Sequence, residues 1–319
     1  MTPSMRWAAR RVREHATGPV VAPPPSHEHV DRVLYGLTRP IVGLRLLVAD
    51  PELLKGALLP AGLIVLLCLW GTFLFPGDHG FIRRFYSMFA FLAPMPSLLM
   101  ARHYARLAAE ARVRIGFGPA EPCIEPITRS LWRTAARAIL IALAVAPMGL
   151  FQGVPILGHL VWKTVLAVWA LHWIVVDAFD AARVLRPGQT LADVDAEVER
   201  LPSPWFVRLM RRGAAHLPVG KWLLSGLARA CDRLARPWRD ELALVEAHPS
   251  LMVGFALSTA LLLATPVLNL LFRPIVLIAA TQVLGRLGEA GAADDFLALP
   301  APAADVGVTT DPAAEVSGA

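Results

Sequence analysis

One arginine interrupts the apolar stretch between Leu251 and Leu284. Arg273 follows Leu270-Leu271-Phe272 and directly precedes Pro274. A charge at membrane depth is costly unless it is paired or hydrated. A guanidinium that faces a wet cavity can bind an oxyanion through two parallel hydrogen bonds. The alternative is that the side chain extends to the membrane interface and has no role in binding.

Two amide side chains belong to the same hypothesis. Gln152 and Asn269 each lie between two prolines that are eight residues apart, inside an apolar stretch. Irregular backbone at membrane depth is tolerated only where it is buried in protein or lines a wet cavity. The amides therefore either cap backbone groups that the prolines leave free, or contact a substrate.

Other charged residues flank the apolar stretches. Asp177 and Asp180 are three residues apart on one helical face, and we expect them to pair with Arg183 or with arginines of the segment that follows. Lys163 and His172 are nine residues apart, so each lines a cavity or an interface separately.

The sequence contains no recognisable catalytic motif. Three cysteines without CxxC spacing indicate neither a disulfide framework nor a zinc site. The segment that ends in Gly220-Lys221 lacks P-loop spacing, and His27-Glu28-His29 is not HExxH. We therefore predict no catalytic residue, no metal, no cofactor and no enzymatic activity.

Composition points to a membrane protein. The 319 residues are 55% hydrophobic and 18% charged, with a mean hydropathy of +0.52 and a net charge of +6. A soluble domain is typically about 45–50% apolar and about 25% charged. These values argue against a soluble enzyme, and the 28 arginines beside three lysines are not by themselves a sign of phosphate recognition.

The apolar stretches predict an all-α polytopic membrane protein. Residues 56–76 form the strongest candidate for a transmembrane helix, and a second one, broken by two prolines, is expected near 84–101. The stretches 137–178 and 250–286 are each broken by prolines near the middle. They predict helical hairpins that penetrate half of the membrane as an inverted repeat, or alternatively two ordinary kinked spans.

The remaining segments are polar. We expect residues 1–34 to form a basic, Pro-rich and largely disordered arm, with a short amphipathic helix as the alternative, and residues 287–319 to form a disordered acidic tail. Residues 181–249 form a basic insert between the two membrane parts, 35–180 and 250–286. Arginine placement puts this insert and the N-terminus in the cytoplasm.

The insert offers a candidate lipid-binding surface. A helix from Lys221 to Ala235 has an apolar stripe, and Arg229, Arg233 and Arg236 lie off that stripe. Such a helix beside membrane spans is typical of contact with anionic lipid head groups, although a solvated face of a helical cap has the same pattern. No motif supports nucleic-acid binding.

Several segments resemble the CysZ-type sulfate permeases, which share a superfamily with the etoposide-induced membrane proteins. The resemblance rests on the segment 266–270 with Pro274 and Ala280-Thr281, and on Ala93-Pro94, the residues 177–180 and the start of the first span. It covers about 190 residues and implies two long spanning helices, two half-membrane hairpins, a homo-oligomer and sulfate as the substrate.

Two positions come from this resemblance. The family has a Gly-Leu-Arg-type turn after a proline before the first span, and it is associated with sulfate. Here the corresponding segment is Pro51-Glu52-Leu53-Leu54-Lys55, so Lys55 is its only cation and Glu52 would repel an anion. A literal Gly43-Leu44-Arg45 lies upstream, which makes Arg45 a displaced substitute.

The sequence therefore predicts an inner-membrane permease for a small oxyanion in a bacterial cell. Its candidate binding residues are Arg273, Asn269, Gln152, Lys55 and Arg45. The alternative is a non-transporting membrane scaffold that uses the basic insert to bind lipid or a protein partner.

Overall fold

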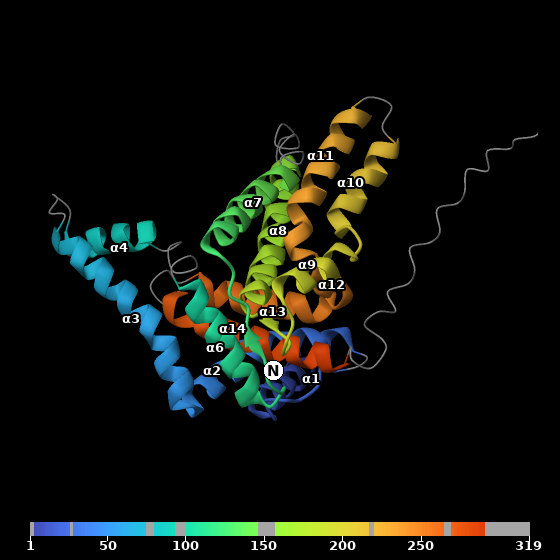
Figure 1. The fold of residues 1–319 in the computed structure, drawn as a ribbon. Helices are drawn as coiled ribbons and strands as arrows, with labels where there is room; N and C mark the ends of the chain where they lie inside the picture. The colour runs from blue at the N-terminus through green and yellow to red at the C-terminus, as the bar shows by residue number, and fades with distance from the viewer. Residues whose placement is uncertain are drawn as a thin grey trace, which may run out of the picture.

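The computed structural model describes residues 3–25, 28–74, 80–92, 100–145, 157–216, 220–264 and 269–290 (Figure 1). Within these ranges the regular structure is helical apart from one antiparallel pair of two-residue strands, β1 (Glu121–Pro122) and β2 (Val184–Leu185). The α-helices are α1 (Pro3–Thr17), α2 (His29–Ala49), α3 (Pro51–Leu74), α4 (Phe81–Leu92), α6 (Ala101–Ile115), α7 (Ile127–Val145), α8 (Leu157–Ala181), α9 (Leu191–Glu199), α10 (Trp205–His216), α11 (Lys221–Ala235), α12 (Arg239–Ala247), α13 (Pro249–Leu263) and α14 (Asn269–Ala290), with a short 3-10 helix, η2 (Arg236–Trp238). The prediction of a helical protein is confirmed for the described residues.

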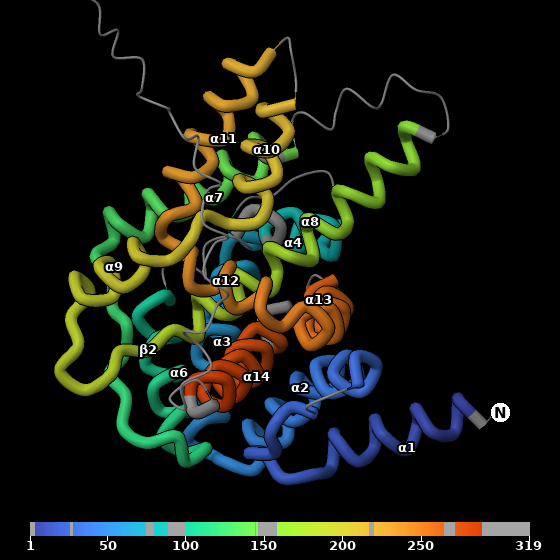
Figure 2. Tube along the Cα trace, turned by 90° about the vertical axis from the view of Figure 1, so that its right-hand side faces the viewer, coloured from blue at the N-terminus to red at the C-terminus, as the bar shows by residue number. Residues whose placement is uncertain are grey.

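A layer formed by α2, α13 and α14 lies at the base of the molecule (Figure 2). α2 and α13 approach closely because glycines face the opposite backbone. A Cβ atom at Gly36 would lie 2.1 Å from the carbonyl oxygen of Leu251, and one at Gly254 would lie 1.9 Å from that of Val33. Small residues are what allow helix backbones to approach so closely. Gly43, on the same face of α2, lies against α14, so the layer fixes the helix that carries the predicted anion site.

Two helical hairpins extend from this layer in Figure 1. One contains α7 and α8, which are linked by the indole Nε1 of Trp169 donating to the carbonyl of Ile141 (3.3 Å). The other contains α10 and α11, which pack on each other, and α11 packs along α7. Trp169 also meets Trp205 and Phe206 of α10 edge-to-face, with ring centroids 6.3 Å and 5.1 Å apart. The basic insert therefore packs beside the first predicted membrane hairpin.

Two helices in the described residues are long and apolar enough to cross a membrane, α3 and the segment Gly158–Ala181 of α8. α13 gives a third only if it forms one broken span with residues 221–247, from which it is bent by 109°. The outward side chains of α3 are apolar, and Leu59, Leu66 and Trp70 are each more than 60% exposed. Such a surface is suited to hydrocarbon rather than water.

In the described residues the second helix of this length is α8. The span expected near 84–101 is described only in part, because α4 ends at Leu92, the next described helix begins at Ala101, and residues 93–99 lie outside the described part of the chain. The 12 residues of α4 give about 18 Å of helix, against a hydrocarbon core of about 30 Å. α8 has 25 residues, or about 37 Å, because it continues through Lys163 as one helix. It is long enough to cross the membrane rather than half of it.

The N-terminal segment expected to be disordered is helical from Pro3 to Thr17, as in the alternative. Arg39, which is fully buried, donates to the carbonyl of His15 (2.9 Å) and stacks over the ring of Tyr35 at 3.8 Å. The hydroxyl of Tyr35 donates to the carbonyl of Ala22 (2.8 Å), so the chain after α1 lies against α2. Residues 291–319, the predicted acidic tail, lie outside the described part of the chain.

Candidate functional site: a cationic cavity beside an ion-pair network

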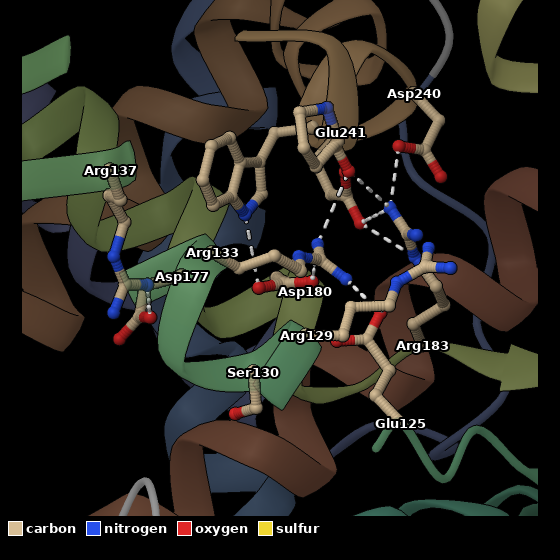
Figure 3. Close-up of polar contacts among 12 residues, drawn as sticks. Glu125, Arg129, Ser130, Arg133, Arg137, Asp177, Asp180, Arg183, Asp240 and Glu241 are labelled. Carbon is tan, nitrogen blue, oxygen red and sulfur yellow. Dashed lines mark hydrogen bonds and ion pairs between the residues drawn. The ribbon is translucent and has the colours of Figure 1, made fainter. Parts of the chain in front are cut away.

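An ion-pair network joins the start of α7 to the end of α8 (Figure 3). Arg133, whose side chain is only 8% exposed, binds Glu125 on one side and Asp180 on the other, the latter at 2.5 Å. One turn further along each helix, Arg137 pairs with Asp177. Arginines four residues apart on α7 thus match aspartates three residues apart on the antiparallel α8. The prediction that Asp177 and Asp180 pair with Arg183 or with arginines of the insert is wrong, because Arg137 and Arg133 of α7 form their ion pairs.

Arg183 forms the second half of the network. Its Nη2 donates to Asp240 at 2.6 Å and also to Glu241, and its Nε donates to Glu241 at 2.9 Å. The indole Nε1 of Trp238 donates to the remaining oxygen of Asp180 (3.1 Å). Burial raises the pKa of the Glu241 carboxyl well above its usual value, against the opposing charge of Arg183. Cation and carboxylate thus alternate from α7 to α12.

A cavity of about 160 Å³ lies against this network. Five arginines line it, and three of them are paired as described above. Arg102 and Arg273 form no ion pair within the described residues. The wall is completed by hydroxyl, thiol, carboxyl and apolar side chains: Tyr104, Ser130, Thr134, Cys123, Glu125, Asp177, Asp180, Ile124, Trp238 and three alanines.

The hydroxyl of Tyr104 is a further unsatisfied group at the cavity. Tyr104 is 7% exposed, and its buried oxygen has no hydrogen-bond partner within the described part of the chain. Tyr104, Arg273 and Asp177 also line a smaller cavity of about 60 Å³ on the side of α13 and α14. An unpaired buried donor costs about 1–3 kcal/mol. A bound anion would supply the acceptor that both Tyr104 and Arg273 lack.

Cys123 lies in the same wall, just after β1. Burial raises the pKa of its thiol to about 11, although Arg183 and Arg133 lie close enough to oppose the shift. The thiol is therefore protonated at neutral pH, the form in which a thiol is a weak nucleophile. Within the described residues no group of three His, Cys, Asp or Glu side chains is arranged to hold a metal ion.

Of the three predicted binding residues whose side chains the structure describes, Arg273 alone lines the cavity. Asn269 is the first residue of α14, and its side chain lies outside the described part, as does all of Gln152. Lys55 is exposed on α3 and is neutralised by Glu52 at 2.8 Å. Arg45 donates to the carbonyls of Ala16 (2.5 Å) and Gly18 (3.4 Å), where it holds the end of α1.

The predicted lipid-binding arginines lie together on the outside of α11. The helix begins and ends where it was predicted, at Lys221 and Ala235. Arg229, Arg233 and Arg236 are all exposed, while Ala228 and Cys231 of the opposite face are buried. Arg236 is 4.0 Å from Glu199, and Arg229 donates to the carbonyl of Ser225 within its own helix.

Sequence reasoning missed Tyr104, Arg137 and Arg133. The spacing of Arg129, Arg133 and Arg137, four residues apart before a Gly/Pro break, is the signal that could have paired α7 with Asp177 and Asp180. Nothing in the sequence indicates that α6 brings Tyr104 to Arg273.

Comparison of the chain with protein-family models, curated proteins and solved structures finds no match.

Proposed function

We propose that this is an integral membrane protein that binds and passes a small oxyanion, with the cavity at Arg273 as its binding site. Sulfate is the substrate that the resemblance to CysZ-type permeases implies. The observation that carries the proposal is a partly buried arginine with no acidic partner in the described residues, facing a cavity together with the unpaired hydroxyl of Tyr104.

The surroundings of the cavity favour an anion as its ligand. Arg137 and Arg273 both line it, and Arg137 is held in place by Asp177. Arginine offers planar pairs of donors that match the oxygens of an oxyanion. Positive groups fixed in a low-dielectric site attract an anion more strongly than they would in water.

The position in the membrane is also part of the proposal. α3 and α8 would cross a bacterial inner membrane, with the ion-pair network, the insert and the N-terminus on the cytoplasmic side, where arginines are concentrated. The α13–α14 hairpin would reach the cavity from within the membrane. The broad apolar surfaces of α3 and α8 would face lipid or a second copy of the chain in a homo-oligomer.

Uptake of radiolabelled sulfate, and in parallel of phosphate, into proteoliposomes of the purified protein tests the proposal. We expect saturable uptake that Arg273→Ala abolishes, because no other described arginine of the α13–α14 hairpin faces the cavity. Lys55→Ala is the matched control, since it removes a cation that the structure places on the outside of α3. Uptake no greater than in empty liposomes, or uptake unaffected by Arg273→Ala, would contradict the proposal.

Uptake no greater than in empty liposomes would favour the membrane-scaffold alternative. The exposed arginines of α11 and the exposed tip residues Trp222 and Leu223, at 77% and 63% exposure, form the surface that such a function would use. Lipid or a protein partner would then bind to the α10–α11 hairpin, and Arg273 would be dispensable.

A further inference from the structure

The cavity presents an acceptor as well as donors. Three carboxylates line it, and each is bound by at least one arginine. Asp180 accepts from Arg133 through one oxygen and from Trp238 through the other, so it is not well placed to accept a hydrogen bond from a ligand. Glu125 binds Arg129 and Arg133 through the same oxygen, Oε1, but it does not line the smaller cavity at Arg273 and Tyr104.

Asp177 is the carboxylate among the three that lines both cavities. Its Oδ1 pairs with Arg137, while no donor within the described residues reaches its Oδ2. Its side chain is 45% exposed, and it lines both cavities together with Arg273 and Tyr104. A carboxylate offers lone pairs only and carries no hydrogen to donate. A ligand at Arg273 and Arg137 therefore meets a free acceptor on one side.

This acceptor distinguishes between oxyanions. Sulfate carries no hydrogen near neutral pH, so all of its oxygens are acceptors, and one of them would have to face the Asp177 carboxylate. Hydrogen phosphate carries a P–OH group, which can donate to that carboxylate. A site that presents a carboxylate acceptor to its ligand discriminates against a ligand that cannot donate to it, because two acceptors would then face each other.

We propose that the cavity selects an oxyanion that carries a hydrogen, of which hydrogen phosphate is the simplest, over sulfate. Arg273, Arg137 and the Tyr104 hydroxyl would donate to its oxygens, and Asp177 would accept from its P–OH. This inference rests on the proposed function and replaces the substrate that the family resemblance implies. A hydrogen bond to a charged group corresponds to a preference of about 10- to 100-fold.

Two sources can supply this chemistry, free inorganic phosphate or the phosphomonoester head group of a lipid. Competition between labelled phosphate and a short-chain phosphatidic acid separates them. If the phosphatidic acid displaces labelled phosphate at a lower concentration than unlabelled phosphate does, the lipid head group is the ligand. Competition only by phosphate would assign the free ion, and both outcomes support the selection of a hydrogen-bearing oxyanion.

The test is equilibrium binding of radiolabelled phosphate and sulfate to the full-length protein in detergent at pH 7. We expect phosphate to bind at least tenfold more tightly than sulfate. Asp177→Asn turns the acceptor into a group that can also donate, so it should reduce or reverse the preference. Asp195→Asn is the matched control, because Asp195 pairs with Arg129 at 2.6 Å but does not line the cavity.

A second measurement needs no variant. Arsenate carries a hydrogen and selenate does not, so arsenate should compete with labelled phosphate at least tenfold more effectively than selenate. Equal or tighter binding of sulfate and selenate would overturn the inference and leave the proposed oxyanion function intact. The absence of binding by any of the four anions would overturn both. A preference unchanged in Asp177→Asn, with the variant folded, would also overturn the role of Asp177.

Discussion

Substitution of Gly254 by alanine tests whether the α2–α13 layer holds the molecule together. A Cβ atom at this position would lie 1.9 Å from the carbonyl oxygen of Val33 and 2.9 Å from the backbone nitrogen of Leu37. Both contacts are with backbone, so no side-chain rotation can relieve them, and the helices must separate by more than an ångström. Overpacking a close contact costs about 1–3 kcal/mol and occasionally more. Alanine gains up to about 1 kcal/mol over glycine in helix propensity, so we expect a net loss of about 2 kcal/mol.

The assay is thermal unfolding of the purified protein in detergent. The quantity measured is the fraction of the protein that remains monodisperse after heating to each temperature. Gly226→Ala is the matched control, because Gly226 lies within α11 and a Cβ atom there meets nothing within 4 Å. We expect Gly254→Ala to unfold at a clearly lower temperature than the wild type, and Gly226→Ala to unfold at the same temperature or higher. If Gly254→Ala is as stable as Gly226→Ala, the close packing of α2 on α13 is refuted.

Two further predictions concern the cavity wall and the surface of α11. With Cys68 and Cys231 replaced by alanine, alkylation of Cys123 at pH 8 should be about 100-fold slower than that of an ordinary thiol, because burial raises its pKa to about 11. The rate should continue to rise about tenfold per pH unit through pH 10, and a plateau near pH 9 would contradict this. Replacing Arg229, Arg233 and Arg236 by glutamine should lower the anionic lipid that copurifies with the protein, since each cation near a membrane contributes about 1 kcal/mol. Unchanged retention of anionic relative to zwitterionic lipid would show that these arginines are only a solvated face.

The apolar pattern predicted helices well and their lengths poorly. α3 was predicted because 22 uncharged residues between Lys55 and Asp78 require a long buried or lipid-facing helix. The first arm of the hairpin 137–178 was counted from Arg137, but α7 already begins at Ile127, and α8 continues through Lys163 to Ala181 as one helix. A single charged residue near a helix end can reach the interface without breaking the helix. Counting uncharged residues therefore underestimates helix length, and half-membrane arms inferred in this way are too short.

The proposed binding site was predicted only in part, because its members are distant in sequence. Arg273 stood out as a charge among apolar residues, and α14 does place it at a cavity. Tyr104 and Arg137 are ordinary helix residues in the sequence, and only the packing of α6 and α7 near α14 brings them to Arg273. Arg45 and Lys55, which entered through a family resemblance, are instead occupied by carbonyls of the α1 end and by Glu52.

The contrast between the network and the cavity is the strongest argument that the site is functional. The chain places acids beside Arg133, Arg137 and Arg183, and the buried network shows that carboxylates are within reach of this region. Breaking a buried pair by removing one partner costs about 3–5 kcal/mol, so an arginine left without a partner reduces stability. A structural role for Arg273 would be served better by an adjacent acid or by an apolar residue. An arginine that has no acidic partner among the described residues, and that faces a cavity beside a hydroxyl in the same position, is therefore expected where a ligand provides the negative charge.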